Sequence, residues 1–221
     1  QEMLYALREH KVLLILQGMD TSGKDGTIKT LFSGINPTGL RAVAFHAPND
    51  DERAHDFLWR VHRQVPVWGE IALFNRSHYE DVLVPRVDGS IDDKELKRRF
   101  AHIRDFERMM AETGTVIIKV FLHISSEEQR ERLQDRIDDP DKQWKFDPLD
   151  LEQRKQWDAY QRAYEEAISA TDTDDAPWYI VPANSKTHRN LIVATLLREA
   201  MKDLRLHYPE PDPDLAKLKI K

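Results

Sequence analysis

The chain contains no cysteine among its 221 residues. Disulfide frameworks and thiolate chemistry are therefore excluded, and the composition fits a cytoplasmic protein. The sequence also lacks an apolar run of transmembrane length, and its first residues do not have the pattern of a secretory signal. We therefore expect a cytoplasmic location and no membrane partner. Because the chain opens directly into patterned sequence, we expect the natural protein to begin further upstream.

An excess of positive charge is missing as well. The chain carries 33 Lys and Arg against 39 Asp and Glu, which gives a net charge of −6. Nucleic acid is therefore not an expected partner, because its binding requires a basic surface. A smaller polyanion would be held by a local cluster of Arg and Lys, since fields act over short distances at cellular ionic strength. The length predicts a single domain over residues 1–221.

Short apolar runs alternate with helical patterns along the chain. This alternation predicts an α/β fold, a three-layer sandwich with a mostly parallel five-stranded sheet. The proline-rich C-terminal segment is expected to be extended and peripheral. Predicted strands are 11–17, 41–47, 70–76, 115–125 and 178–183, and predicted helices are 50–64, 92–114, 126–139, 150–171 and 185–205, with a further helix opening near Lys24.

The first predicted strand runs into GMDTSGKDG, residues 18–26, which has the spacing of a phosphate-binding P-loop. In such a loop, backbone N–H groups and a helix N-terminus surround an anion, and Lys24 supplies a point charge. The alternative is a simple turn between a strand and a helix. The phosphate contacts expected in this loop are Thr21, Ser22, Gly23, Lys24, Asp25 and Gly26.

The loop lacks the Ser or Thr that normally follows the lysine and holds Mg²⁺, and Asp25 stands in its place. A carboxylate beside a bound polyphosphate is repelled unless a cation lies between them. We therefore expect Asp20, Asp25 or both to hold Mg²⁺, with Mn²⁺ as a substitute, directly or through water. For Asp25 the alternative is an acid that the dipole of the helix N-terminus favours.

A second polar segment, FNRSHYED, follows the third predicted strand at residues 74–81. Open parallel sheets bind ligands beyond the carboxyl ends of their strands, where this segment lies. Arg76 can bind a phosphate through two hydrogen bonds. The alternative is a polar loop with a structural Arg–Glu pair, and Arg60 lies in a helical pattern that also suits core packing. The nucleotide contacts expected here are Arg60, Arg76, Glu80 and Asp81.

A third cationic segment, RERLQDRIDDPDKQWKFDPLD, occupies residues 130–150. Arg132 and Arg136 are four residues apart and share a helix face. We expect a helical lid over about 128–150 that closes over phosphates, excludes water and adds positive charge. The alternative is a solvated charged helix. Arg132, Arg136 and Lys145 are the expected phosphate contacts of this lid.

The segments GMDTSGKDG, FNRSHYEDVLVPRV and DDPDKQWKF together resemble the polyphosphate kinase 2 family, in the family's order and spacing, from about residue 11 to about residue 205. The resemblance implies a thymidylate-kinase-like, P-loop kinase fold and a homodimer or homotetramer. It implies reversible, Mg²⁺-dependent phosphoryl transfer between polyphosphate and nucleotides. NRSHYED is similar to the subgroup that uses AMP as well as ADP, and guanine nucleotides are further candidate acceptors.

The resemblance also implies how the reaction is arranged. The polyphosphate end approaches the P-loop, and the acceptor nucleotide lies opposite. Catalysis is then positioning and charge neutralisation, without a general base, because the acceptor oxygen is already a phosphate anion. Asn75 stands where many relatives have Asp, which departs from the family pattern. The catalytic residues implied are Asp20, Lys24, Asn75, Arg76 and Arg136.

Two other functions fit the same residues. An ATP-dependent nucleoside monophosphate kinase of the thymidylate-kinase type would use the same loop, arginines and lid. Only the missing Ser or Thr and the two acidic residues of the loop argue against it. A non-catalytic sensor of phosphate or nucleotide is the third candidate, and the full set of cationic residues disfavours it.

Overall fold

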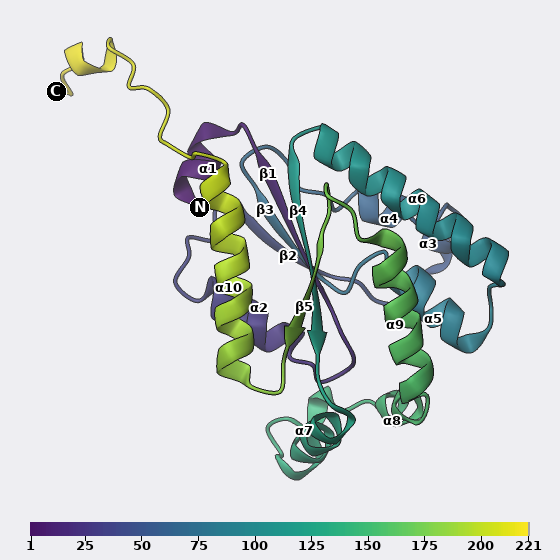
Figure 1. Ribbon diagram of the computed structural model, residues 1–221. Coiled ribbons are helices and arrows are strands. Elements are labelled where there is room, and N and C mark those ends of the chain that lie inside the picture. Colours follow the sequence, from purple (N-terminus) through teal and green to yellow (C-terminus); the bar gives the residue numbers. More distant parts are fainter. Residues whose placement is uncertain (221) are drawn as a thin grey trace.

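The computed structural model describes residues 1–220 and has one parallel sheet between two layers of helices (Figure 1). The strands are β1 (Lys11–Gln17), β2 (Leu40–Ala44), β3 (Ile71–Asn75), β4 (Thr115–His123) and β5 (Trp178–Pro182). Their order is β2-β3-β1-β4-β5, and every neighbouring pair is parallel. The predicted α/β sandwich with a mostly parallel sheet is confirmed. All carboxyl ends of the strands therefore meet at one edge.

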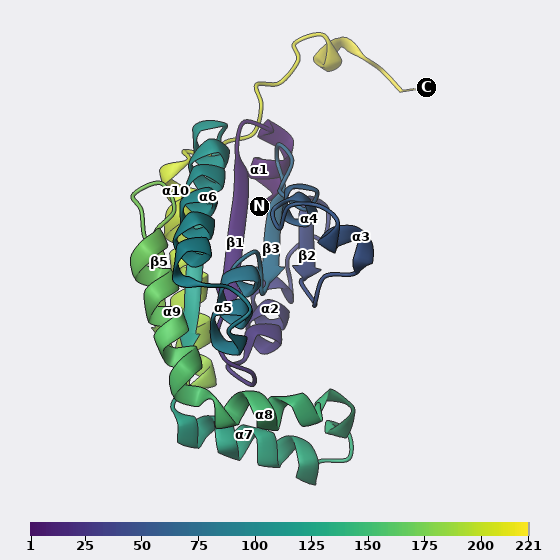
Figure 2. The same ribbon diagram turned by 90° about the vertical axis from the view of Figure 1, so that its right-hand side faces the viewer.

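The helices cover both faces of this sheet. Helices α1, α2 and α10 lie on one face and α5, α6 and α9 on the other, while α7 and α8 project beyond the carboxyl edge of the strands (Figures 1 and 2). Within residues 1–220 the helices are α1 (Glu2–Leu7), α2 (Lys24–Phe32), α3 (Asp50–Arg53), α4 (Trp59–His62), α5 (Glu80–Asp88), α6 (Asp93–Glu112), α7 (Ser126–Asp138), α8 (Pro148–Lys155), α9 (Trp157–Thr171) and α10 (Lys186–Asp203), with 3₁₀ turns η1 (Gln143–Lys145) and η2 (Leu215–Lys217).

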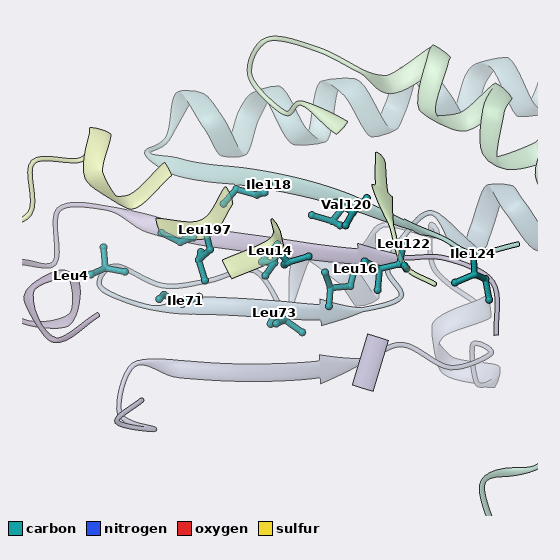
Figure 3. Packing of buried hydrophobic residues seen from close by; sticks show 14 residues of the cluster. Leu4, Leu14, Leu16, Ile71, Leu73, Ile118, Val120, Leu122, Ile124 and Leu197 are labelled. Atoms are coloured by element: carbon teal, nitrogen blue, oxygen red, sulfur yellow. The ribbon is translucent and has the colours of Figure 1, made fainter. Parts of the chain in front are cut away.

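The central strand β1 is buried on both faces, because its side chains alternate between two hydrophobic cores. Leu14 and Leu16 pack in the core beneath α1, α2 and α10 (Figure 3). Leu13 and Ile15 pack on the opposite face, in the core that includes Phe106 of α6. Such a strand needs an apolar side chain at every position, which explains why a continuous apolar run predicted it correctly.

Two helices differ from the sequence prediction. The pattern at 50–64 forms the short helices α3 and α4, because the Asp56 side chain accepts a hydrogen bond from the Leu58 backbone N–H at 3.0 Å and favours a turn. The pattern at 150–171 is divided at Gln156, which ends α8 and begins α9. The predicted lid at 128–150 covers most of α7, the turn η1 and the start of α8.

The C-terminal segment after α10 leads away from the sheet, as expected from its prolines, and up to residue 220 it contains only the turn η2 (Figure 1). Helix α1 was not predicted, because six residues are too few for a clear helical period. No helix within residues 1–220 has both the length and the apolar character needed to cross a bilayer.

Candidate active site

The P-loop joins β1 to α2 and wraps around the side chain of its own lysine. Thr21 has a left-handed φ of 64° and Gly23 a φ of 101°; the first conformation stores strain of about 1–3 kcal/mol, whereas glycine adopts the second freely. Lys24 Nζ donates to the carbonyl oxygens of Gly18 at 2.7 Å and Met19 at 3.2 Å. Burial lowers the pKa of Lys24, and the nearby carboxylate of Asp20 opposes this shift.

Arg76 follows β3 directly and pairs with the P-loop. Its backbone has a left-handed φ of 62°, and its Nη2 donates to Asp20 Oδ1 at 2.7 Å. Burial alone would raise the pKa of Asp20, but the charges of Lys24 and Arg76 outweigh it and hold the pKa below its usual value. Asp20 is therefore ionised at neutral pH.

The preceding residue on β3 makes the matching contact on the other side of Lys24. Asn75 Nδ2 donates to Asp25 Oδ1 at 2.6 Å. Asn75, the last residue of β3, thus binds Asp25. Arg76, the residue after it, binds Asp20. Sequence reasoning predicted all of these residues for the site, and the structure brings them together at one edge of the sheet.

Asp20 and Asp25 remain the expected ligands of a magnesium ion that would also bind phosphates. Mg²⁺ is commonly held by one or two carboxylates, with phosphate oxygens and water completing its octahedron. The negative charges of Asp20 and Asp25 both oppose the lowering of the Lys24 pKa that burial causes. No group of three or more His, Cys, Asp or Glu forms a complete protein cage within residues 1–220. The remaining ligands would therefore come from phosphates and water.

Glu80 opens α5 and faces the same space. Burial raises the pKa of its carboxyl group, and the charges of Arg76 and Lys24 partly oppose that effect. In the amide orientation that satisfies both of its ends, the buried Gln17 donates to Glu80 Oε1 at 3.0 Å and accepts from Ser77 Oγ at 3.0 Å. Glu80 therefore has a fixed position and a weakened acidity at the centre of the site.

These side chains border a narrow pocket that is partly open to solvent. Sequence reasoning missed three of its polar and aromatic residues: Gln153 on α8, and Tyr160 and Tyr164 on α9. The tyrosines are four residues apart and so share one helix face, a spacing visible in WDAYQRAYEE. The lining residues are Gly18, Met19, Asp20, Arg76, Glu80, Val84, Gln153, Tyr160 and Tyr164.

Helix α7 is fixed to the back of the P-loop. Gln129 Nε2 donates to the backbone oxygen of Asp20 at 3.2 Å. The buried guanidinium of Arg132 donates to Glu128 and to the backbone oxygens of Thr21, Ala183 and Asn184, at 2.7–2.9 Å. We predicted Arg132 as a phosphate contact. These contacts favour a structural role, and the contact of Arg132 with phosphate stays a prediction.

Arg136, one turn further along α7, has looser contacts. Its Nη1 lies 3.3 Å from both the backbone oxygen of Lys145 and Asp150 Oδ2. Its charge also contributes to the lowered pKa of Asp20, after the larger effects of Lys24 and Arg76. Lys145 is exposed, with its Nζ 5.0 Å from the centroid of the Trp144 ring. In the lid, Arg136 therefore contacts the backbone oxygen of Lys145 and the side chain of Asp150, whereas the Lys145 side chain is exposed to solvent.

Arg60 and Asp81 bind each other rather than lining the pocket. Arg60 Nη2 donates to Asp81 Oδ2 at 2.9 Å, and Nη1 donates to the backbone oxygen of His46 at 2.7 Å. This ion pair favours the structural alternative, and their contact with a nucleotide stays a prediction. The hydroxyls of Thr21 and Ser22 in the P-loop are buried without a hydrogen-bond partner within residues 1–220, and their contact with phosphate stays a prediction.

The chain is similar to known proteins over nearly its whole length. The sequence profile of the family described as polyphosphate kinase 2 (PPK2) matches residues 1–208. An AMP/ADP-polyphosphate phosphotransferase of Meiothermus ruber is 53% identical over 220 residues, which cover 100% of this chain and 82% of that protein. An ADP-polyphosphate phosphotransferase of Rhodopseudomonas palustris is 45% identical, over 96% of this chain and 78% of that protein.

Solved structures agree with these relatives. The crystal structure of polyphosphate kinase 2 from Arthrobacter aurescens TC1 matches 98% of this chain and 78% of that chain, with a TM-score of 0.95 and 46% identity. A thymidylate kinase from Candida albicans matches 89% of this chain and 93% of that chain, with a TM-score of 0.53 and 14% identity. The second likeness is one of fold alone, and it agrees with the predicted P-loop kinase architecture.

Proposed function

Because this chain belongs to the polyphosphate kinase 2 family, we propose that it transfers a phosphoryl group reversibly between inorganic polyphosphate and a nucleotide. AMP and ADP are the proposed acceptors, which would give ADP and ATP. The name of the relative that is 53% identical to this chain over 220 residues supports both acceptors. Guanine nucleotides are further proposed acceptors.

The observation that carries this proposal is the pairing of Asn75 with Asp25 and of Arg76 with Asp20 around Lys24. A P-loop with a carboxylate at the Ser or Thr position suits a donor made only of phosphates. Such a donor brings several negative charges and needs cations between its oxygens and the loop. When bound, Mg²⁺ or Mn²⁺ would supply that charge neutralisation, and Asp20 and Asp25 would hold it.

The residues of this chain then divide the remaining work. Lys24 leaves the carbonyl oxygens of Gly18 and Met19 and binds the phosphates of the donor. Arg76 and Arg136 approach the transferred group from β3 and from the lid, and both stabilise charge on its oxygens. The acceptor phosphate attacks in line without a general base, because its oxygen is already ionised.

The acceptor nucleotide is proposed to occupy the pocket beside Glu80, Tyr160 and Tyr164. Closure of the lid beyond the part of α7 that Gln129 and Arg132 hold to the P-loop would exclude water from the transferred group, since water would otherwise hydrolyse the donor.

An assay without ATP tests the proposal. Purified protein is incubated with polyphosphate, Mg²⁺ and either AMP, ADP, GMP or GDP, and the products are separated by chromatography. Formation of ADP from AMP and of ATP from ADP is the expected result. Turnover of AMP with ATP as donor, combined with inertness toward polyphosphate, would show the thymidylate-kinase type of reaction instead.

The remaining expectations are also proposals. We propose a homodimer or homotetramer, which light scattering on the purified protein measures directly. A cytoplasmic location is supported by the absence of cysteine. The net charge of −6 supports the absence of a nucleic-acid partner, and a mobility-shift assay at low salt would detect one.

A further inference from the structure

Arg189 is a buried cation that the reaction described above does not use. It lies in the first turn of α10, and only 3% of its surface is exposed. Its guanidinium donates to the backbone oxygen of Ser22 at 3.3 Å and to Asn190 Oδ1 at 3.0 and 2.9 Å. All of these acceptors are neutral. The described part of the chain provides Arg189 with hydrogen bonds but with no ion pair to an acid within 4 Å.

The surroundings of Arg189 add charge of the same sign. Arg132 lies close enough for its charge to lower the pKa of Arg189, after the larger effect of burial. Arg132 has one acidic partner, Glu128, at 2.7 Å. Two buried guanidinium groups behind the P-loop are thus accompanied by a single carboxylate. An unpaired charge in such a place is costly for the folded protein, unless an anion outside the fold compensates it.

The position of Arg189 shows where such an anion would lie. A Cβ atom placed on Gly23 would fall 1.8 Å from Arg189 Nη1, and one on Gly26 would fall 3.3 Å from Nη2. The guanidinium therefore lies directly against the first turn of α2, whose N–H groups carry the anion-binding partial charge of the P-loop. A side chain at position 23 would collide with the Arg189 guanidinium, so glycine is needed there for this contact as well as for the φ of 101°.

Arg189 and the nucleotide pocket approach the P-loop from opposite layers of the sandwich. The pocket is lined from α5, α8 and α9, whereas Arg189 comes from α10, which lies beside α2 on the other face of the sheet (Figures 1 and 2). A charge at this flank is close to the donor site and further from the acceptor. Its field is also weakly screened, because the side chain is buried.

We propose that Arg189 is an electrostatic binding residue for the phosphate chain of the donor, acting through the P-loop without entering the nucleotide pocket. This inference rests on the proposed function, because it assigns the positive charge to the polyphosphate side of that site. Arg189 selects for a multiply charged donor, and the bound donor in turn compensates the unpaired guanidinium.

A purely structural role for Arg189 makes different predictions. Asn190 already joins α10 to α2, because its side chain accepts from Thr27 Oγ1 at 3.2 Å and donates to Thr30 Oγ1 at 3.0 Å. If Arg189 served only as a second link between α10 and α2, its replacement would lower the melting temperature. It would also lower the affinities for AMP and for tripolyphosphate to the same extent. An electrostatic role affects the donor alone and depends on salt.

The test compares Arg189→Gln and Arg189→Lys with wild type and with Arg198→Gln. Arg198 is an exposed arginine of the same helix, paired with Glu199 at 2.9 Å, and serves as the matched control. Calorimetry measures the binding of inorganic tripolyphosphate with Mg²⁺ across a series of salt concentrations, and the binding of AMP in parallel. Thermal melts without ligand accompany each variant.

For Arg189→Gln we expect the tripolyphosphate affinity to fall about tenfold at low salt, while AMP affinity stays unchanged. The slope of log affinity against log salt should become shallower by about one, as when one cation is removed from a polyanion site. Arg189→Lys should keep most of the affinity, and Arg198→Gln should match wild type. An unchanged slope, or equal losses for AMP and tripolyphosphate, would overturn the inference.

These binding measurements need no turnover, so they are independent of the proposed activity. Tripolyphosphate binding that depends on Arg189, in a protein inert in the assay without ATP, would remove the proposed function and leave the role of Arg189 intact. Turnover of the wild type with polyphosphate, together with undiminished tripolyphosphate binding by Arg189→Gln, would support the proposed function and overturn the role of Arg189.

Discussion

Arg76 and Asp20 form an ion pair of 2.7 Å that joins the end of β3 to the P-loop. Neither residue is free in this arrangement, because the guanidinium holds the carboxylate that the proposed cation would also bind. On the proposed function, a cation and a donor would change the partners of both groups. Asp20 would hold the cation, and Arg76 would bind a phosphate of the donor.

Replacement of either loop acid should raise the demand for Mg²⁺. We expect Asp20→Asn and Asp25→Asn each to increase the Mg²⁺ concentration for half-maximal activity about tenfold or more, because each removes a proposed cation ligand. The measurement is a Mg²⁺ titration of activity at saturating substrates. Asp105→Asn, which changes a solvated acid on α6, is the control and should leave the titration unchanged. A lower maximal rate with an unaltered Mg²⁺ midpoint would contradict the role in cation binding.

Lys24→Ala should abolish nearly all turnover while the protein stays folded. The loss expected is about 10³-fold or more, since the lysine is proposed to act on the charge of the transferred group. Steady-state rates and a thermal melt on the same sample are the measurements. Lys29→Ala, at an exposed position of the same helix, is the matched control. A loss smaller than about tenfold, equal to about 1.4 kcal/mol, is too little for this role.

Arg132 and Arg136, one helical turn apart, should respond in opposite ways. Arg132→Met removes hydrogen bonds to four buried or half-buried oxygens, and we expect a melting temperature lower by several degrees. Arg136→Ala breaks only two contacts of 3.3 Å, so its melting temperature should stay near that of wild type while turnover falls strongly. Calorimetric melts and rates of both variants decide the matter. Equal thermal losses in the two variants would show that Arg136 is structural too.

Glu80→Gln should make the protein more stable at alkaline pH and less active. Burial raises the pKa of Glu80, so the folded state binds its proton more tightly than the unfolded state does. The stabilisation from this proton is complete below the ordinary carboxyl pKa and is lost as pH rises through the raised value. Glutamine cannot ionise, so the variant does not lose this stability at high pH. Its melting temperature should exceed that of wild type at pH 8 and differ little from it at pH 4.

The control for this measurement is Glu165→Gln, at an exposed position of α9, which should show no such pH dependence. Asp20 provides an internal contrast, because its pKa is lowered. Its contribution to stability is present above the ordinary carboxyl pKa and is lost as pH falls through the lowered value. A gain for Glu80→Gln that is larger at pH 4 than at pH 8 would contradict the burial of an acidic proton at this position.

The sequence predicted the elements whose signal is local. The run KVLLILQ has no polar residue between its ends, and only a strand buried on both faces requires this. The P-loop was equally visible, because its glycine spacing lies within one segment. Lys24, Asp20 and Arg76 were placed together because the carboxyl ends of parallel strands meet at one edge.

The roles of the remaining site residues could not be predicted, because they depend on contacts between elements that are distant in sequence. Arg132 and Arg136 look equivalent in sequence, but only the first is opposite the backbone oxygens of the P-loop and of the segment after β5. Spacing within a helix fixes which residues share a face and leaves open what that face meets. For the same reason Tyr160, Tyr164 and Arg189 were not foreseen, since each reaches the site from a helix distant in sequence.

The hydrogen bonds of Lys24 to Gly18 and Met19 have a consequence for selectivity. Peptide oxygens already accept hydrogen bonds from this ammonium group, so an incoming anion competes with them. A singly charged ion gains less from that exchange than a chain of phosphates, which meets the lysine, the loop amides and the arginines at once. The backbone of the loop therefore favours anions with several charges over those with one.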